Sequence, residues 1–224
     1  MKVLSLEFSS SRRSVAVFDP AQMAEPIVVV AMPAAPRQGT GVFTLVDQAL
    51  KQAAWQRQEV THLAVGLGPG SYTGIRAAIS AAQGWATAAP LIILGVPSVD
   101  SLTEQLRRGG TKGEVLLAFD AQRGELYAGR FLIDPDGSES LSPLRLTTLA
   151  EAKAARDGGI PVHGPDLEAL MAEAHPLFPC AGTAARLAVG CPRSLEVPGE
   201  TLAPIYLREV SFVKLPLFQA RQEN

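Results

Sequence analysis

The residues best suited to chemistry form a glycine-rich run, Gly68-Pro69-Gly70-Ser71-Tyr72-Thr73-Gly74-Ile75-Arg76, between a predicted strand and a predicted helix. Glycines permit positive φ and let another backbone or a ligand come close. Ser71 or Thr73 can accept hydrogen bonds from the unpaired N–H groups of a helix start, and such a terminus can hold an anion. A candidate nucleotide or anion site therefore comprises Gly68, Pro69, Gly70, Ser71, Thr73, Gly74 and Arg76. A tight, well-capped turn explains the same residues equally well.

Two familiar phosphate-binding motifs do not match this loop. A P-loop needs a lysine, and none lies between Lys51 and Lys112. The dinucleotide fingerprint needs a glycine where Ser71 stands. Arg76 opposes the dipole of the predicted helix, which indicates either a specific carboxylate or phosphate partner or a surface salt bridge.

The histidines and cysteines do not form a metal-binding pattern. His62, His163 and His175 have no i, i+4 spacing that would place two imidazoles on one helix face. We predict no metal site. Cys180 and Cys191 are interpreted as buried, reduced thiols.

Catalytic side chains are equally hard to find. The stretch from Gly70 to Gly74 is offset from the Gly-x-Ser-x-Gly elbow of serine hydrolases. Asp120, Arg123 and Glu125 can form an acid and base cluster, but charged residues in a hairpin turn are more often a solvated tip. We predict no catalytic residue.

Composition is that of a folded protein that does not collect nucleic acid unaided. The 224 residues are 47% hydrophobic and 19% charged, which excludes a disordered chain. The net charge is −2 and the pI about 5.9, so RNA chemistry would need a partner that holds the RNA. The apolar windows are shorter than the ~20 residues of a membrane span, and we expect a cytoplasmic protein.

Predicted strands and helices alternate along the first half of the chain and would position the glycine loop. We predict a hairpin of two strands, a third strand, a helix capped by Thr40, then strand, glycine loop, helix, strand and a helix capped by Ser98. Their ranges are 2–6, 14–18, 27–31, 40–55, 62–65, 75–89, 91–96 and 98–106. A glycine-rich and basic linker follows at 107–113, and we place a domain boundary after residue 108.

The second half begins with a clear hairpin, 114–119 and 125–133, and then loses its pattern. We predict helices near 149–156 and 167–174, with loops or short strands at 161–163, 177–180 and 195–198. The segment from Pro204 to Val210 is predicted to be short and either helical or extended.

The chain resembles the TsaB family of tRNA threonylcarbamoyladenosine biosynthesis proteins. The family carries the loop seen at 68–76, the Ala-Gln-Gly step at 82–84 and the stretch at 94–98. The hairpin at 119–127 and the late segment at 204–208 continue the match. One departure counts against a nucleotide role: the family's first strand ends in Asp-Thr-Ser, whereas this chain has Glu7-Phe8-Ser9.

The resemblance implies an actin-like ATPase fold, an α/β fold of two related domains, here 1–108 and 109–224. It implies a non-catalytic subunit that supports a TsaD-like enzyme, which installs N6-threonylcarbamoyl on the adenosine next to the anticodon. A TsaE-like ATPase would join the complex, tRNA would be bound indirectly, and the chain alone would form a homodimer. No cofactor is expected in this chain, although ATP or ADP can bind at the complex interface.

The two helices of the first half are the expected partner interface. Small residues of the second helix let another helix approach closely, and packing within the chain's own helical layer is the alternative. The interface residues would be Val42, Leu45, Val46, Ala49, Ile75, Ala78, Ile79, Ala82 and Trp85. Two other functions stay open: an independent actin-like kinase or ATPase acting on a small molecule, and a metalloprotease-like activity that lacks visible ligands.

Overall fold

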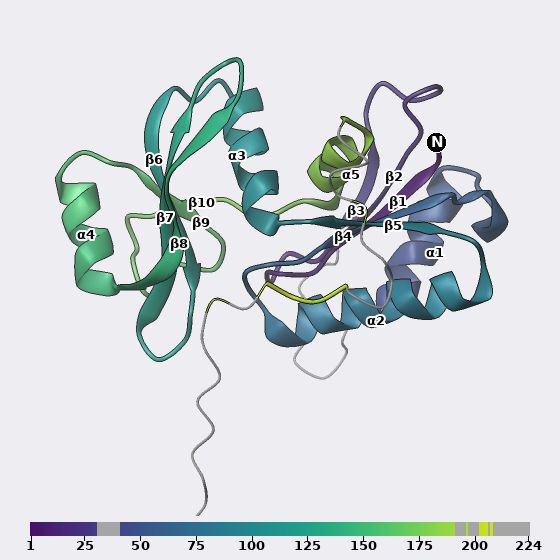
Figure 1. Ribbon diagram of the computed structural model, residues 1–224, viewed down its shortest axis with the longest axis horizontal. Coiled ribbons are helices and arrows are strands. Elements are labelled where there is room, and N and C mark those ends of the chain that lie inside the picture. The colour runs from purple at the N-terminus through teal and green to yellow at the C-terminus, as the bar shows by residue number, and fades with distance from the viewer. Residues whose placement is uncertain (31–40, 191–195, 197–201, 206, 208–224) are drawn as a thin grey trace, which may run out of the picture.

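The structure, a computed structural model, describes residues 1–30, 41–190, 196, 202–205 and 207. These residues form two five-stranded sheets with helices against them, as Figure 1 shows. The strand orders are β3-β2-β1-β4-β5 and β10-β9-β6-β7-β8, and each sheet mixes parallel and antiparallel pairs. The predicted α/β fold class is confirmed.

The first sheet contains every strand predicted in the first half. Central β1 pairs antiparallel with β2 and parallel with β4. All residues of β1 and β2 are buried, because helices cover both faces of the sheet. The strands are β1 (Val3–Glu7), β2 (Ser14–Phe18), β3 (Ile27–Val30), β4 (His62–Gly66) and β5 (Ile92–Val96).

One face of this sheet carries α1 (Val42–Gln52) and α2 (Tyr72–Ala88). The N-cap of α1 is Gly41, without a side-chain cap; the predicted cap, Thr40, lies outside the described residues. The helix ends before Trp55, which is buried in the core instead.

The helix α2 begins three residues earlier than predicted. The Ser71 Oγ accepts a hydrogen bond from the Gly74 N–H at 3.3 Å and so caps the first turn. The loop is therefore tighter than the sequence indicated, and Tyr72 and Thr73 already belong to the helix.

The second sheet begins with the predicted hairpin, β6 (Gly113–Asp120) and β7 (Glu125–Ile133). β7 also pairs with an 11-residue edge strand, β8 (Ser138–Thr148), which the sequence analysis missed. Two short strands, β9 (Val162–Gly164) and β10 (His175–Pro176), complete the sheet.

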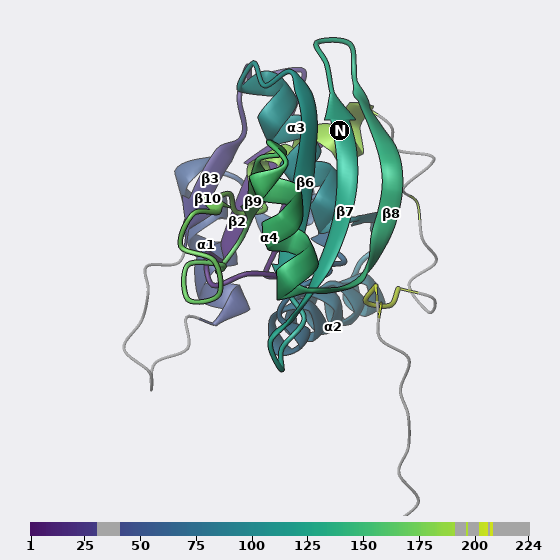
Figure 2. The same cartoon turned by 90° about the vertical axis from the view of Figure 1, so that its left-hand side faces the viewer.

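The helix α4 (Leu149–Asp157) covers the outer face of this sheet, in front of the strands in Figure 2. A capping box between Thr148 and Glu151 fixes its start. The helix predicted at 167–174 is wrong: these residues form turns that join β9 to β10.

Two helices are exchanged between the halves of the chain. α3 (Ser98–Arg108) follows the first sheet but packs on the second, through Val99, Leu102 and Leu106. α5 (Ala181–Gly190), which was not predicted, follows the second sheet and packs on the first through small alanines. Both helices lie between the two sheets in Figure 1.

The domain boundary after residue 108 stays a prediction. Across that boundary, α3 of the first half packs on the second sheet and α5 of the second half packs on the first sheet. Within the described residues, no helix combines the length and apolar character of a membrane span. Cys180 is a half-buried free thiol, and Cys191 lies outside the described residues.

Candidate functional site

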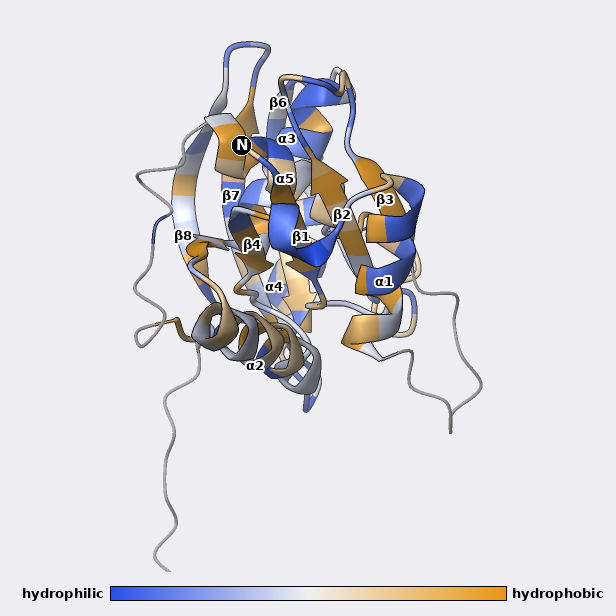
Figure 3. Ribbon diagram, turned by 90° about the vertical axis from the view of Figure 1, so that its right-hand side faces the viewer, coloured by the Kyte–Doolittle hydropathy of each residue, from blue (hydrophilic) through white to orange (hydrophobic). Residues whose placement is uncertain are grey.

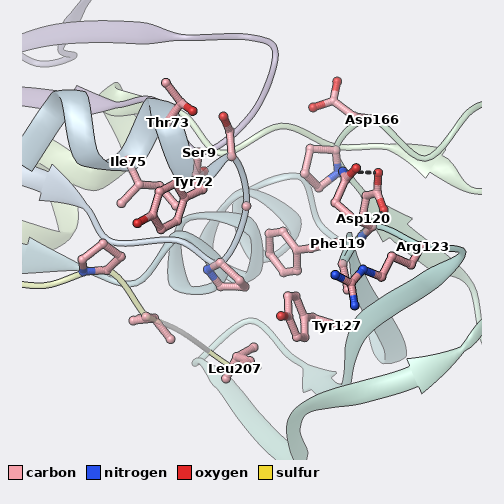
Figure 4. A pocket seen from close by; sticks show the side chains of 18 residues that line it. Ser9, Tyr72, Thr73, Ile75, Phe119, Asp120, Arg123, Tyr127, Asp166 and Leu207 are labelled. Atoms are coloured by element: carbon pink, nitrogen blue, oxygen red, sulfur yellow. Dashed lines mark hydrogen bonds between the residues drawn. The ribbon is translucent and has the colours of Figure 1, made fainter. Parts of the chain in front are cut away.

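A cavity of about 580 Å³ lies between the two sheets. The first half contributes the glycine loop and Ser9, and the second half contributes the β6–β7 hairpin and the turn after β9. Figure 4 shows Ser9, Tyr72 and Thr73 across the pocket from Phe119, Arg123 and Tyr127. The described lining residues are Ser9, Pro69, Gly70, Ser71, Tyr72, Thr73, Ile75, Phe119, Asp120, Ala121, Gln122, Arg123, Tyr127, Pro165, Asp166, Pro204, Ile205 and Leu207.

The glycines of the loop are required by backbone packing against the end of β1. A Cβ at Gly70 would lie 2.0 Å from the Ser9 carbonyl oxygen, and a Cβ at Gly74 would lie 2.0 Å from the Phe8 carbonyl oxygen. Such approaches exclude any side chain. This packing accounts for the two glycines without a ligand, which supports the structural alternative raised by the sequence.

Four N–H groups of the loop and its helix start donate to the chain's own acceptors. The Ser71 N–H donates to the Ser9 carbonyl at 2.7 Å, and the Gly68 N–H donates to the Ser98 hydroxyl at 3.1 Å. The Gly74 N–H is taken by Ser71 Oγ and the Ile75 N–H by the Ser71 carbonyl. A phosphate-binding loop instead points such donors at its ligand.

Glu7 is fully buried beneath the loop. Its carboxylate accepts hydrogen bonds from the Ser9 N–H and the Ser98 hydroxyl, both at 2.9 Å. Burial raises the pKa of Glu7, and these hydrogen bonds partly offset that rise. Gly66 leaves the room that the carboxylate occupies, since a Cβ there would lie 2.3 Å from Glu7 Oε2.

Ser98 therefore does not cap α3 as predicted. The N-cap position belongs to Pro97, and Ser98 is the first helical residue. Its hydroxyl links the Glu7 carboxylate to the Gly68 N–H, while its own N–H donates to the Gly68 carbonyl at 2.8 Å. The residue joins β1, the glycine loop and α3 into one unit.

The turn between β6 and β7 is held in a strained form. Gln122 and Arg123 both have positive φ, 65° and 61°, which costs free energy for residues other than glycine. The Asp120 carboxylate accepts the Gln122 N–H at 2.7 Å and the Gln122 side-chain amide at 2.9 Å. Asp120 thus shapes the turn, and Glu125 lies at the start of β7.

Two contacts join the halves of the chain beside the cavity. The Ser11 N–H and hydroxyl both donate to the Asp166 carboxylate, the former at 2.9 Å. The late segment contributes the Ile205 N–H, which donates to the Leu67 carbonyl at 2.9 Å. This segment has no regular secondary structure where it is described, and it forms part of the cavity wall.

Arg76 contacts a residue of its own helix. Its Nη1 donates to the Tyr72 hydroxyl at 2.8 Å, and the guanidinium lies 5.2 Å from the centre of the Tyr72 ring. The guanidinium of Arg76 therefore lies along the surface of α2, against Tyr72.

Seven of the nine predicted interface residues lie in the chain's own core. Each is at most 5% exposed, while Val42 and Trp85 are half-buried. These seven form the apolar layer between the two helices and the first sheet, so a partner can touch Val42, Trp85 and the outer positions of these helices but not the seven. The seven are Leu45, Val46, Ala49, Ile75, Ala78, Ile79 and Ala82.

Histidines do not gather into a metal centre in the described part of the chain, where no group of three metal-ligating side chains occurs. His163 and His175 are opposite each other on β9 and β10, with ring centres 4.9 Å apart. Burial, and then the charge of His175, lowers the pKa of His163.

The sequence analysis found the first-half wall of the cavity and missed most of the second. Ser9, Phe119 and Tyr127 were quoted only as parts of longer stretches. The pairing of Phe119 with Tyr127 across β6 and β7 was available from the predicted hairpin, and it was the signal that could have pointed to an aromatic wall.

Two mixed sheets with exchanged helices and a cavity between them define an actin-like ATPase fold. A YeaZ protein of Pseudomonas aeruginosa shares this fold, with a TM-score of 0.72 over 92% of this chain and 99% of that chain at 22% identity. Residues 39–160 match the family model described as TsaD: tRNA N6-adenosine threonylcarbamoyltransferase. The chain belongs to this family.

Two curated relatives carry the same name, tRNA threonylcarbamoyladenosine biosynthesis protein TsaB. The protein from Escherichia coli K12 is 30% identical over 138 residues, which are 61% of this chain and 58% of the relative. The protein from Bacillus subtilis is 29% identical over 106 residues, 47% of this chain and 45% of the relative. The chain thus spans about half of the length of the curated relatives that it matches.

Proposed function

We propose that this protein is a non-catalytic, cytoplasmic subunit of the machinery that places N6-threonylcarbamoyl on the adenosine next to the anticodon. It would bind and support a TsaD-like catalytic subunit, with a TsaE-like ATPase in the same complex and tRNA held indirectly. Similarity to proteins named for threonylcarbamoyladenosine biosynthesis supports the pathway.

The observation that carries the supporting role is the internal use of the loop donors. Four N–H groups of the glycine loop and its helix start are bonded within the chain. The nearby carboxylate of Glu7 is buried and shielded from any metal-bound phosphate. Phosphoryl transfer depends on a phosphate cradle and on carboxylates that hold Mg²⁺, so both observations count against the alternative of an independent kinase.

The surface of α2 supports the docking role. Arg76 is the one charged residue of this 17-residue helix. The ribbon of α2 in Figure 3 has few strongly hydrophilic positions, in contrast to α1. Most exposed or half-buried positions of α2 are small, and they are Thr73, Ala77, Ser80, Ala81, Gly84, Ala86, Thr87 and Ala88; the larger ones are Tyr72, Arg76, Gln83 and Trp85. Small residues let the backbone of a partner helix come near.

The position of Gly84 makes this surface testable. A Cβ at Gly84 would meet nothing within 4 Å, so Gly84→Arg places a large cation on the outer face without disturbing the core. Ala78 and Ala82 are 0% exposed, and arginine at either position would unfold the chain instead. Ala154→Arg on α4 is the matched control, because Ala154 is an exposed helical alanine on the other sheet.

The experiment is size-exclusion chromatography with light scattering, on the chain alone and with the TsaD homologue of the same genome. With the homologue we expect a one-to-one complex, which Gly84→Arg abolishes and Ala154→Arg preserves. Without the homologue we expect a homodimer, and the two substitutions should affect it in the same way. Runs with and without ATP or ADP test nucleotide at the complex interface. No complex under any condition, with phosphoryl transfer by the isolated chain, would restore the kinase.

A further inference from the structure

We infer that the cavity between the sheets binds a neutral, planar molecule of nucleoside size, without a metal ion and in preference to its phosphorylated forms. This inference goes beyond the proposed docking function, which uses the outer face of α2. Four properties of the cavity support it: size, aromatic rings, charge and hydrogen-bonding groups.

The first property is size. A volume of about 580 Å³ lies within the ~300–1,000 Å³ of cavities that enclose a small organic ligand. Both sheets contribute walls, the Ser11–Asp166 contact joins those walls, and the Ile205–Leu67 hydrogen bond attaches the late segment to the first-half wall. A molecule in the cavity would therefore be surrounded by both halves of the chain.

The second property is a wall of aromatic rings. Tyr127 lines the cavity from β7, and its partner across the hairpin, Phe119, is 1% exposed and packs with it in the core of the second sheet. Tyr72 lies across the pocket from them in Figure 4. Planar rings are held well by such pairs of aromatic faces, because stacking tolerates any flat heterocycle.

The third property is charge. The described lining residues include two carboxylates, Asp120 and Asp166, and one guanidinium, Arg123. No lysine is among them, and the N–H groups of Gly68, Ser71, Gly74 and Ile75 are bonded within the chain. Each phosphate added to a ligand would meet more repulsion than attraction here, which favours a neutral molecule.

The fourth property is the supply of hydrogen-bonding groups for hydroxyls and ring nitrogens. The described lining includes the hydroxyls of Ser71 and Thr73 and the side-chain amide of Gln122. Hydroxyl and amide groups can both donate hydrogen bonds to and accept them from sugar hydroxyls and heterocyclic nitrogens.

The test is isothermal titration calorimetry of the full chain with adenosine, with AMP in the presence of EDTA, and with MgATP. We expect adenosine to bind at least ~10-fold more tightly than either phosphorylated compound, because the described lining carries two carboxylates and one guanidinium. Tyr127→Ala should weaken adenosine binding about 10-fold, the effect of losing one stacked ring, and Tyr127→Phe should leave it within about twofold.

Two further variants keep the result interpretable. Tyr72→Ala removes a ring that is 57% exposed, so it does not threaten the fold, and it should weaken adenosine binding severalfold. Phe43→Ala removes an exposed ring from α1 and should change nothing. The inference is overturned by tighter binding of MgATP or AMP, by no heat with adenosine at millimolar concentration, or by adenosine binding that neither Tyr127→Ala nor Tyr72→Ala affects. Association with the TsaD homologue should be unchanged by Tyr127→Ala, so the two proposals can fail separately.

Discussion

The Glu7 carboxylate and the Ser98 hydroxyl meet 2.9 Å apart at a place that solvent does not reach. The two residues are 91 positions apart, at the end of β1 and the start of α3. Because the same hydroxyl also accepts the Gly68 N–H, this contact fixes the glycine loop between the strand and the helix. Glu7 is thus a structural residue whose ionisation matters to stability.

The stability of the protein should depend on pH through Glu7. Burial raises the pKa of this carboxyl, so the folded state holds the proton more tightly than the unfolded state. The unfolding free energy then falls as pH rises above the ordinary glutamate value of about 4.3, by up to about 1.4 kcal/mol per pH unit, until the folded pKa is passed. Below that range the contribution is fully present.

Glu7→Gln should remove this dependence. Relative to wild type, the variant should gain stability between pH 4 and pH 7, as measured by urea unfolding at each pH. Glu139→Gln on the exposed edge strand is the control and should follow the wild-type curve. Parallel curves for wild type and Glu7→Gln would contradict the assignment.

A second prediction concerns the space that Glu7 occupies. A Cβ at Gly66 would lie 2.3 Å from Glu7 Oε2 and 2.5 Å from its Cδ, so Gly66→Ala should destabilise the protein by about 1–3 kcal/mol. Glu7→Asp shortens the side chain by one methylene and should relieve the clash. In a double-mutant cycle the two changes together should therefore cost at least ~0.5 kcal/mol less than their sum; strict additivity would show that the residues do not compete for space.

The regular elements of the first half were predictable because each strand or helix carries its own pattern. β1, β2, β4 and β5 are apolar runs bounded by polar or glycine-rich stretches, and both faces of their sheet are covered. Boundaries were less secure. α2 starts early because of the Ser71 cap, and Ser98 is inside α3 because its hydroxyl serves Glu7.

The second half was less predictable because its elements depend on distant partners. β8 has one buried residue in eleven, so it lacks the alternation of a half-buried strand, and its pairing with β7 defines it. The alanines of α5 carry little periodic signal, and packing against the first sheet stabilises them. At 167–174 the sequence has a helix-like pattern, but the residues form turns.

The candidate site shows the same limit. The glycine loop was visible as a motif, but the carbonyl groups that it packs against, those of Phe8 and Ser9, lie some 60 residues earlier. Local sequence cannot distinguish a glycine that approaches a ligand from one that approaches another strand. The buried state of the predicted interface residues was also hidden, because small apolar residues suit both a core and a docking face.

A third prediction contrasts two glycines near and on α2. Gly70 has a φ of 147° and no room beside the Ser9 carbonyl, so Gly70→Ala should destabilise the protein by more than about 1 kcal/mol. Gly84 is helical and faces open space, so Gly84→Ala should stabilise it by about 0.5–1 kcal/mol. Thermal and urea unfolding check both signs. Equal effects would mean that the loop glycine is free to move away from β1.

The last prediction concerns the contact that joins the two halves beside the cavity. The Ser11 N–H and hydroxyl both donate to the Asp166 carboxylate, and both residues are exposed. Asp166 has a φ of 56°, which glycine adopts easily, so Asp166→Gly removes both hydrogen bonds without adding backbone strain. Global stability should therefore change little, while the turn between β1 and β2 should open more often.

Hydrogen exchange measured by mass spectrometry separates these two effects. In Asp166→Gly, amides of residues 9–13 should exchange about 5–10-fold faster, as expected for the loss of about 1 kcal/mol of local hydrogen bonding. Asp136→Gly, a similar change in the exposed turn after β7, should leave these amides unaffected. Because Ser9 and Asp166 both line the cavity, faster exchange would identify this contact as the one that holds its two walls together, and unchanged exchange would assign that role to the remaining contacts between the sheets.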